Sequence, residues 1–349
     1  MTTNLLTRMA PRSPVGADGS RNLKRPLIIL TVVVIVAAFT PLVLPDSRQA
    51  VAVNVLIIAM MGIGWNLMSG YGGMFSFGHA AFFGIGAYTD AYLIVHYDIS
   101  PWISLFIGAA IAALVAIVIG YVAFRYKLRA AYFALATFAF AEMLRLLATN
   151  TDWLNGTAGL HVPLLKDDSW WMLQFDANAM QYFYIGLALL VVCVLITMFY
   201  LRSRSGIYTV AIRDNEEAAD SLGVNVMRVK LTTMAVSAAI TAVAGMFYTQ
   251  YYIFVDPEIA FGNAQSVQAI TPAVIGGIAT IWGPVVGALI IGPLNELTAE
   301  WGRTPPAILD FLAGRSGLDV VVYSILLIII VLVLPKGIVG SIRLWWRQR

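Results

Sequence analysis

The long apolar runs of this sequence contain few charged or titratable side chains. Glu142 and Arg145 are three residues apart in the run 131–148, a spacing that places both on one face of a helix. Charged groups in an apolar environment are costly, and they are usually paired or turned toward a protein interior. The spacing therefore predicts a mutual ion pair that also holds a neighbour, with a role in a polar route through the protein as the alternative.

Glycine punctuates the run 75–95 and the residues before it. The positions are Gly70, Gly72, Gly73, Gly78, Gly84 and Gly86. Glycine accepts positive φ and close backbone approach, and small residues let membrane helices pack tightly. One interpretation is therefore helix packing. The other is a broken helix whose freed backbone groups line a route, helped by Ser76, Phe77 and His79.

The remaining titratable groups offer no cluster. Asp90 and His96 stand toward the end of the same run and are expected to reach water. His79 is expected to donate a hydrogen bond in helix packing. The three histidines show no metal-ligand spacing, and Cys193 is the single cysteine, which excludes a disulfide framework and a cysteine-based metal site.

Motifs for enzymatic catalysis are missing from the sequence. No Gly-Lys dipeptide occurs, so the chain holds no G-x-x-x-x-G-K-[ST] phosphate loop and is not itself an ATPase. The H-E-x-x-H, G-x-S-x-G and Cys-x-x-Cys patterns do not occur either. No nucleophile and base emerge, so an intramembrane enzyme is the least favoured class.

The composition indicates the class of protein in which these residues lie. Of the 349 residues 60% are hydrophobic and 12% are charged, whereas a soluble domain has roughly a quarter charged residues. The net charge of +3 is too small for a nucleic-acid footprint. These values exclude an ordinary cytosolic enzyme, a disordered chain and a nucleic-acid binder, and they predict an all-α polytopic membrane protein.

A membrane-spanning helix needs roughly 20 mostly apolar residues, and about ten runs qualify as transmembrane or re-entrant helices. They are Pro26–Leu44, Ala50–Leu67, Phe75–Val95, Trp102–Phe124, Ala131–Ala148, Gln181–Leu201, Leu231–Ile253, Val267–Ile281, Pro284–Leu297 and Val320–Leu334. The third, eighth and ninth are short or glycine-rich, which favours broken or re-entrant segments buried in protein or lining a cavity.

The distribution of basic residues sets the orientation. With the N-terminus inside, 17 of the 22 Lys and Arg residues fall on the inner side, four fall outside and one lies within a span. The positive-inside rule then places both termini in the cytoplasm. The expected organisation is a flexible basic tail at 1–25, a transmembrane domain at 26–335 and a basic tail at 336–349. Within that domain 149–180 form a large extracytoplasmic loop and 202–230 a cytoplasmic one.

The inner loop predicts a short exposed helix. Asn215 is a helix cap, Glu216 and Glu217 match the positive end of the helix dipole, and Gly223 is a natural C-terminal stop. The small side chains of Ala218 and Ala219 permit close approach of a partner. A solvated connector is the alternative interpretation.

Glu217-Ala218-Ala219, three further residues and Gly223 resemble the EAA-x-x-x-G loop of bacterial ABC importer permeases. The resemblance extends to the branched-chain amino acid permeases of the LivM type. It is carried by GWNLMSGYGGMFSFGHAAFFGIGAY (64–88), AYFALATFAFAEMLRLL (131–147), LNGTAGLHVP (154–163), AIRDNEEAADSLG (211–223), VIGGIATIWGPVVGALI (274–290) and LPKGIVG (334–340). Ala279, where the family commonly has Gly, and Asp90, where it has a small residue, depart from the pattern.

The resemblance implies a permease subunit of the bacterial inner membrane. It implies a homologous second permease of the LivH type, two ATP-binding subunits that hold ATP and Mg, and an extracytoplasmic substrate-binding protein. This chain would itself carry no cofactor. Glu217, Ala218, Ala219 and Gly223 would couple it to an ATP-binding subunit, and the import would proceed by alternating access.

The substrate implied by the resemblance is a branched-chain amino acid: leucine, isoleucine or valine. Because a free amino acid is a zwitterion, half-helix ends could meet its two charges. Gly72, Gly73, Ser76, Phe77, Gly78 and His79 are the candidate pathway residues, and a glycine-rich hairpin at 276–287 is a candidate internal repeat. The alternatives are a urea, short-amide or other small-solute permease of the same family, and a proton-coupled secondary transporter using Asp90, Glu142 and Arg145.

Overall fold

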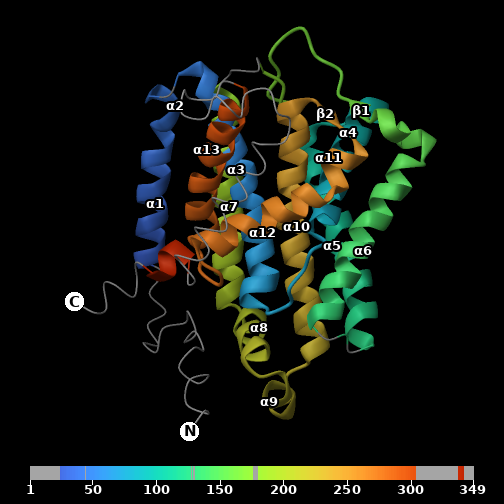
Figure 1. The fold of residues 1–349 in the computed structure, drawn as a ribbon, viewed down its shortest axis with the longest axis vertical. Helices are drawn as coiled ribbons and strands as arrows, with labels where there is room; N and C mark the ends of the chain where they lie inside the picture. Colours follow the sequence, from blue (N-terminus) through green and yellow to red (C-terminus); the bar gives the residue numbers. More distant parts are fainter. Residues whose placement is uncertain are drawn as a thin grey trace.

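The computed structural model describes residues 24–43, 45–126, 128, 130–175, 180–303 and 337–341, which form a bundle of helices (Figure 1). The long helices are α1 (Lys24–Ala38), α3 (Asp46–Trp65), α4 (His79–Tyr97), α5 (Pro101–Arg125), α6 (Ala130–Thr149), α7 (Met180–Arg202), α10 (Val226–Tyr252), α12 (Asn263–Gly276) and α13 (Gly283–Arg303). The short elements are α2 (Thr40–Val43), the π-helix η1 (Asn66–Tyr71), the 3₁₀ turns η2 (Asp152–Leu154) and η3 (Gly156–Ala158), β1 (Leu160–His161), α8 (Arg204–Asp214), α9 (Glu216–Ser221), β2 (Phe254–Val255) and α11 (Pro257–Phe261).

The prediction of an all-α polytopic membrane protein is confirmed. The first nine predicted runs each coincide with one or two helices, and the tenth, Val320–Leu334, lies outside the described residues. Among the described residues five helical segments are long and apolar enough to cross a membrane. They are Arg48–Tyr71, Pro101–Arg125, Ala131–Thr149, Met180–Arg202 and Val226–Tyr252.

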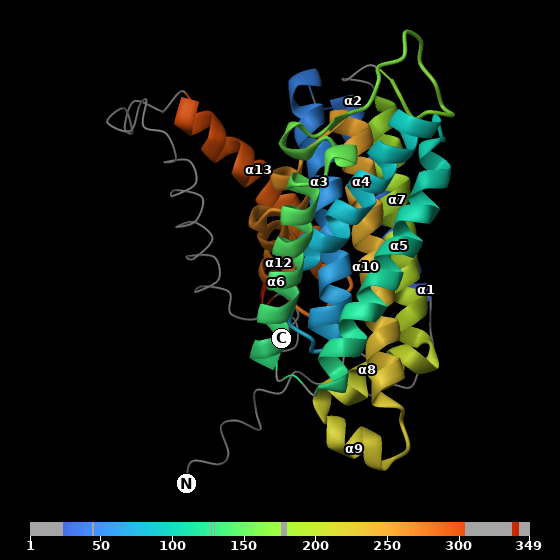
Figure 2. The same ribbon diagram turned by 90° about the vertical axis from the view of Figure 1, so that its right-hand side faces the viewer.

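Helix α3 lies at the centre of the bundle, and α5 and α6 lie at its edge. In α3 and η1 83% of the most apolar window is buried, against 28% in α5 and in α6. Helix α10 packs along α3, α4 and α5, and α13 lies against α3 and α12. Figure 2 shows α13 tilting away from the other helices.

Small residues bring α4 and α10 into backbone contact. A Cβ atom on Gly86 would stand 2.0 Å from the carbonyl oxygen of Ala242, and one on Gly245 would stand 2.0 Å from that of Phe83. Real atoms do not approach so closely, so only glycine fits at these two positions. The crossing is a small-residue contact of the kind that drives helix association in lipid.

The two large loops lie at opposite ends of the bundle (Figure 1). Helices α8 and α9 occupy one end. At the other, part of the loop after α6 forms an antiparallel pair, β1 with β2, in which Leu160 faces Val255 and His161 faces Phe254. No pattern in the sequence predicted this pair. Gly159, at φ +71°, precedes β1 and leaves no room for a side chain, since a Cβ there would stand 2.4 Å from the carbonyl oxygen of Val255, far along the chain.

The helix breaks are also present. Helix α3 runs into η1, residues 72–78 are not helical, and α4 begins only at His79, four residues later than the predicted Phe75. Helices α12 and α13 are likewise separated by the turn 277–282. The third and eighth runs, Phe75–Val95 and Val267–Ile281, therefore each include non-helical residues, whereas the ninth, Pro284–Leu297, lies wholly within α13.

Candidate functional site

The first helix break, residues 72–78, is held by side chains of the same chain. Trp65 Nε1 donates to the carbonyl oxygen of Ser76 at 2.8 Å, and Ser69 Oγ donates to that of Met74 at 3.0 Å. The backbone N–H of Phe77 donates to Thr137 Oγ1 of α6 at 3.2 Å. Non-helical backbone at membrane depth needs such partners because the lipid supplies none.

His79, at the start of α4, is a buried packing group. Its Nε2 lies 3.1 Å from Ser237 Oγ, and Ser237 donates its one hydroxyl proton to the carbonyl oxygen of Gly64 at 2.6 Å. His79 Nε2 must then carry a proton and donate it to Ser237, which leaves Nδ1 to accept from Ser76 Oγ at 3.3 Å. This arrangement corresponds to the expected role of His79 as a donor in helix packing.

The break presents alternate residues to opposite sides, as an extended strand does. Gly73, Phe75 and Phe77 are exposed, whereas Met74 and Ser76 between them are buried. The Phe75 ring packs edge-on against Phe77, with centroids 5.2 Å apart. Of the predicted pathway residues, the open face therefore carries Gly73 and Phe77.

The other predicted pathway residues, Gly72, Ser76, Gly78 and His79, are buried behind that face. Phe75 was not among the predicted pathway residues, although the alternation of phenylalanine with smaller residues in MFSFG indicated it.

Asn66 joins the two helix breaks. Its Nδ2 donates to the carbonyl oxygen of Thr280 at 2.8 Å, and its Oδ1 accepts from the N–H of Ala279 at 2.8 Å. Ala279 has φ +56°, a left-handed conformation that favours glycine over alanine. Asn66 was not among the predicted site residues, although its amide is unusual within an apolar run.

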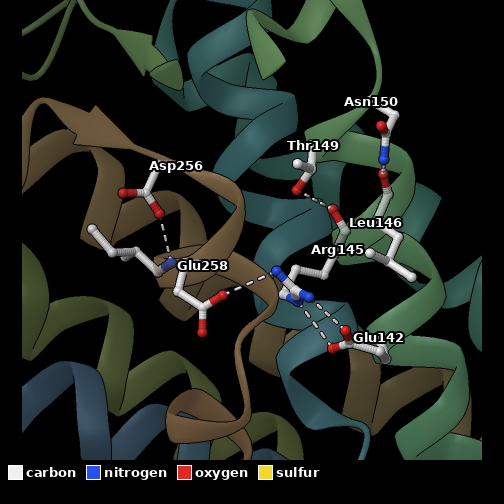
Figure 3. A network of polar contacts seen from close by, with 8 residues as sticks. Glu142, Arg145, Leu146, Thr149, Asn150, Asp256 and Glu258 are labelled. Atoms are coloured by element: carbon white, nitrogen blue, oxygen red, sulfur yellow. Dashed lines mark hydrogen bonds and ion pairs between the residues drawn. The ribbon is translucent and has the colours of Figure 1, made fainter. Parts of the chain in front are cut away.

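Glu142 and Arg145 form the predicted pair and hold a neighbour (Figure 3). Arg145 Nη2 lies 2.6 Å from Glu142 Oε1, and its Nη1 lies 3.1 Å from Glu258 Oε2 of α11. Asp256 Oδ1 caps α11 by accepting from the N–H of Ile259 at 2.7 Å. The network therefore ties α6 to α11 at the end of the bundle opposite α9.

Asp90 is buried inside the bundle, so the expectation that it reaches water is wrong. It is fully buried on α4, and its carboxyl oxygens contact Ser104 Oγ of α5 and Gln250 Nε2 of α10. The salt bridges found in the described part of the chain do not include Asp90. Ser104 Oγ also lies 3.0 Å from the carbonyl oxygen of Pro101, so its single proton faces two acceptors. Protonation of Asp90 would supply the missing proton.

The inner-loop helix is formed at the expected residues. Asn215 Oδ1 accepts from the N–H of Ala218 at 2.9 Å, which caps the start of α9. Gly223, just beyond its end, has φ +82°, and its N–H donates to the carbonyl oxygen of Asp220 at 2.8 Å. Glycine is suited to this left-handed position.

The four candidate coupling residues divide into two groups. Glu217, Ala218 and Gly223 are exposed, as is Leu222, which is 86% exposed. Ala219 is buried in a small cluster with Ile212 of α8 and Val229 of α10. The exposed residues can meet a partner, while Ala219 fixes α9 to its own chain.

The described ranges hold no group of three or more His, Cys, Asp or Glu side chains placed to bind a metal ion.

Together, the apolar bundle and its membrane-length helices define a polytopic membrane protein, and its interrupted helices are a feature typical of transporters. The chain belongs to the family "Branched-chain amino acid transport system / permease component", whose model matches residues 47–334. It is therefore a permease component of a transport system.

Individual relatives support this assignment. The chain is 28% identical to the "High-affinity branched-chain amino acid transport system permease protein LivM" of Escherichia coli over 307 residues, 82% of this chain and 71% of that protein. It is 29% identical to the LivH protein of Salmonella typhimurium over 296 residues, 81% of this chain and 91% of LivH. The BraD protein of Pseudomonas aeruginosa is 27% identical, with 81% and 91% covered. No solved structure matches.

Proposed function

We propose that this chain is a membrane-spanning subunit of an ATP-driven ABC importer for leucine, isoleucine and valine. The family membership and the printed functions of LivM, LivH and BraD support a branched-chain amino acid as the substrate. The cell membrane of a bacterium is the proposed location, with both chain termini in the cytoplasm.

The observation that carries the proposal is the exposed helix α9. Asn215 and Gly223 fix its two ends, and Glu217, Ala218 and Leu222 stand free on its surface. A helix held rigidly at the end of a bundle and bearing an exposed leucine is suited to a groove on a partner protein. The proposed partners are two ATP-binding subunits, which bind ATP and Mg and move α9 as they close and open.

Alternating access is the proposed mechanism. Residues 150–175 lie at the end opposite α9, where an extracytoplasmic binding protein would deliver substrate. A second, homologous permease subunit would complete the pathway. Within this chain Gly73, Phe75 and Phe77 offer an exposed face, and the aromatic rings suit an aliphatic side chain.

The first test is purification of the tagged chain in mild detergent, with identification of the proteins that accompany it. We expect two ATP-binding subunits and a homologous permease, and an ATPase activity that rises when a leucine-loaded binding protein is added. Stimulation only by a urea- or amide-loaded binding protein would overturn the proposed substrate. A chain that purifies alone and drives uptake in a proton gradient would overturn the importer itself.

A further inference from the structure

We infer that Arg213 is the positioning residue that passes the movement of α9 to both helix breaks. The inference rests on the proposed function. It follows from a series of packing contacts and hydrogen bonds that begins beside α9 and ends at the turn between α12 and α13.

The first link makes α9 and its surroundings one mechanical unit. Ala219 packs between α8 and α10, and Lys230 Nζ of α10 pairs with Glu216 Oε2 of α9 at 2.6 Å. A force on α9 therefore moves α8 and the first turns of α10 with it.

Helix α8 is in turn fastened to its neighbours by hydroxyl groups. Thr209 Oγ1 lies 2.8 Å from Thr233 Oγ1 of α10, and the Tyr200 hydroxyl of α7 lies 2.8 Å from the same atom. All three hydroxyls are in mutual contact, since Tyr200 and Thr209 are 3.3 Å apart. Helix α8 is thus held firmly against α7 and α10.

The second link is Arg213, in the last turn of α8. Its Nη1 donates to the carbonyl oxygen of Gly70 in η1 at 3.2 Å, and its Nη2 lies 2.8 Å from Asp214 Oδ1. The side chain is only 13% exposed. It is wedged against the first break, because a Cβ on Gly73 would stand 2.7 Å from Arg213 Cγ.

The third link crosses to the second break. Gly70 touches Asn66, since a Cβ on Gly70 would stand 2.2 Å from Asn66 Oδ1 and 2.9 Å from the N–H nitrogen of Ala279. Asn66 binds Ala279 and Thr280 through both ends of its amide. Displacing Arg213 would therefore disturb η1, the exposed phenylalanines after it, and the turn 277–282 together.

This arrangement assigns Arg213 a role that a docking contact does not have. The Arg213 guanidinium is largely covered and donates inward to Gly70 at the helix break. Its removal should therefore leave ATP hydrolysis intact and weaken the coupling of hydrolysis to transport. Substitution by lysine keeps a charged donor for Gly70 but loses the forked geometry that binds Gly70 and Asp214 at once.

The experiment is leucine uptake per ATP hydrolysed by the complete complex in liposomes, for the wild type, Arg213→Gln and Arg213→Lys. We expect Arg213→Gln to reduce this ratio about tenfold, the size expected from the loss of one hydrogen bond to a charged group. Arg213→Lys should recover part of it. The control is Arg204→Gln, which removes the same charge from the exposed start of α8 and should leave the ratio unchanged.

Asn66→Leu breaks the series at its other end. If one series carries the movement, Arg213→Gln combined with Asn66→Leu should lower the ratio no further than the more harmful single variant. Additive losses, or an unchanged ratio in Arg213→Gln, would overturn the inference while leaving the importer intact. A wild-type complex without ATP-driven uptake would instead overturn the proposed function.

Discussion

Arg145 and Glu258, which are 113 residues apart in the chain, form an ion pair of 3.1 Å that joins α6 to α11. The two side chains differ in exposure: Glu258 is 75% exposed and Arg145 is 25% exposed. Arg145 also binds Glu142 through two nitrogens, at 2.6 and 3.0 Å. Arg145 is therefore the centre of the network, and the two carboxylates contribute unequally.

The first prediction follows from this inequality. Glu258→Gln should lower the free energy of unfolding by less than about 0.5 kcal/mol, since exposed ion pairs contribute little. Arg145→Met leaves Glu142 without its donor at an apolar surface, which should cost about 1–2 kcal/mol. Thermal unfolding of the purified complex in detergent measures both, with Asp152→Asn as a control for the lost charge at the same end.

Glu142→Gln separates a structural network from a transport role. A structural pair predicts a lower yield or melting temperature with little change in the affinity for leucine. Altered substrate selectivity at normal expression would contradict that assignment and would place Glu142 in the route.

The second prediction concerns Asp90, whose surroundings suit a protonated acid. Asp90→Asn keeps a neutral group of the same shape that can both donate and accept, so folding and uptake should be close to wild type. Asp90→Ala leaves Ser104 and Gln250 without that partner, which should cost about 1–3 kcal/mol. An infrared carbonyl band of a protonated carboxyl, present in the wild type and absent in Asp90→Asn, would report the proton directly.

Asp90 also distinguishes the two transport mechanisms. In an ATP-driven importer, Asp90→Asn should transport at every pH at which the wild type does. Loss of uptake in Asp90→Asn with normal folding would favour a proton relay.

The third prediction tests the contact between α4 and α10. Gly245→Ala puts a methyl group 2.0 Å from the carbonyl oxygen of Phe83, so the helices must separate, at a cost of about 1–3 kcal/mol. Gly108→Ala on α5 is the matched control, since its nearest neighbour, Gly86 Cα, lies at 3.5 Å. There the better helix propensity of alanine should raise the melting temperature by the equivalent of up to about 1 kcal/mol. If Gly245→Ala and Gly108→Ala changed the melting temperature in the same direction, the close packing of α4 and α10 would not explain the result.

Local signals account for what the sequence could predict. Apolar runs locate α3, α5, α6, α7 and α10, because a spanning helix satisfies its own backbone and needs no distant partner. The cap of α9 was predictable for the same reason, since Asn215 acts on residues three and four positions away. The spacing of Glu142 and Arg145 likewise brought them together without tertiary information.

Contacts between residues far apart in the chain account for what the sequence could not predict. Asp90 stands near the end of an apolar run, yet Ser104 and Gln250 enclose it from two other helices. The β1–β2 pair and the link from Arg213 to Gly70 likewise join segments far apart in the chain. No periodicity within one segment carries such information.

The fourth prediction uses Gly223 to separate folding from docking. Because no atom lies within 4 Å of a Cβ at this position, only the φ of +82° restricts the residue. Asn and Asp tolerate the left-handed region better than other non-glycine residues, so Gly223→Asn and Gly223→Asp should both preserve α9. The two side chains have the same shape and differ in charge.

If the exposed end of α9 docks on an ATP-binding subunit, the added charge decides the outcome. Gly223→Asp introduces an unpaired carboxylate into the proposed interface, where its desolvation is costly, and should abolish uptake while the protein remains in the membrane. Gly223→Asn should retain most of the uptake. Glu217→Arg, a charge reversal on the exposed side of the same helix, should fail as Gly223→Asp does. Normal uptake in Gly223→Asp would show that this end of α9 faces water throughout the cycle, and the docking surface would then have to lie elsewhere on the loop.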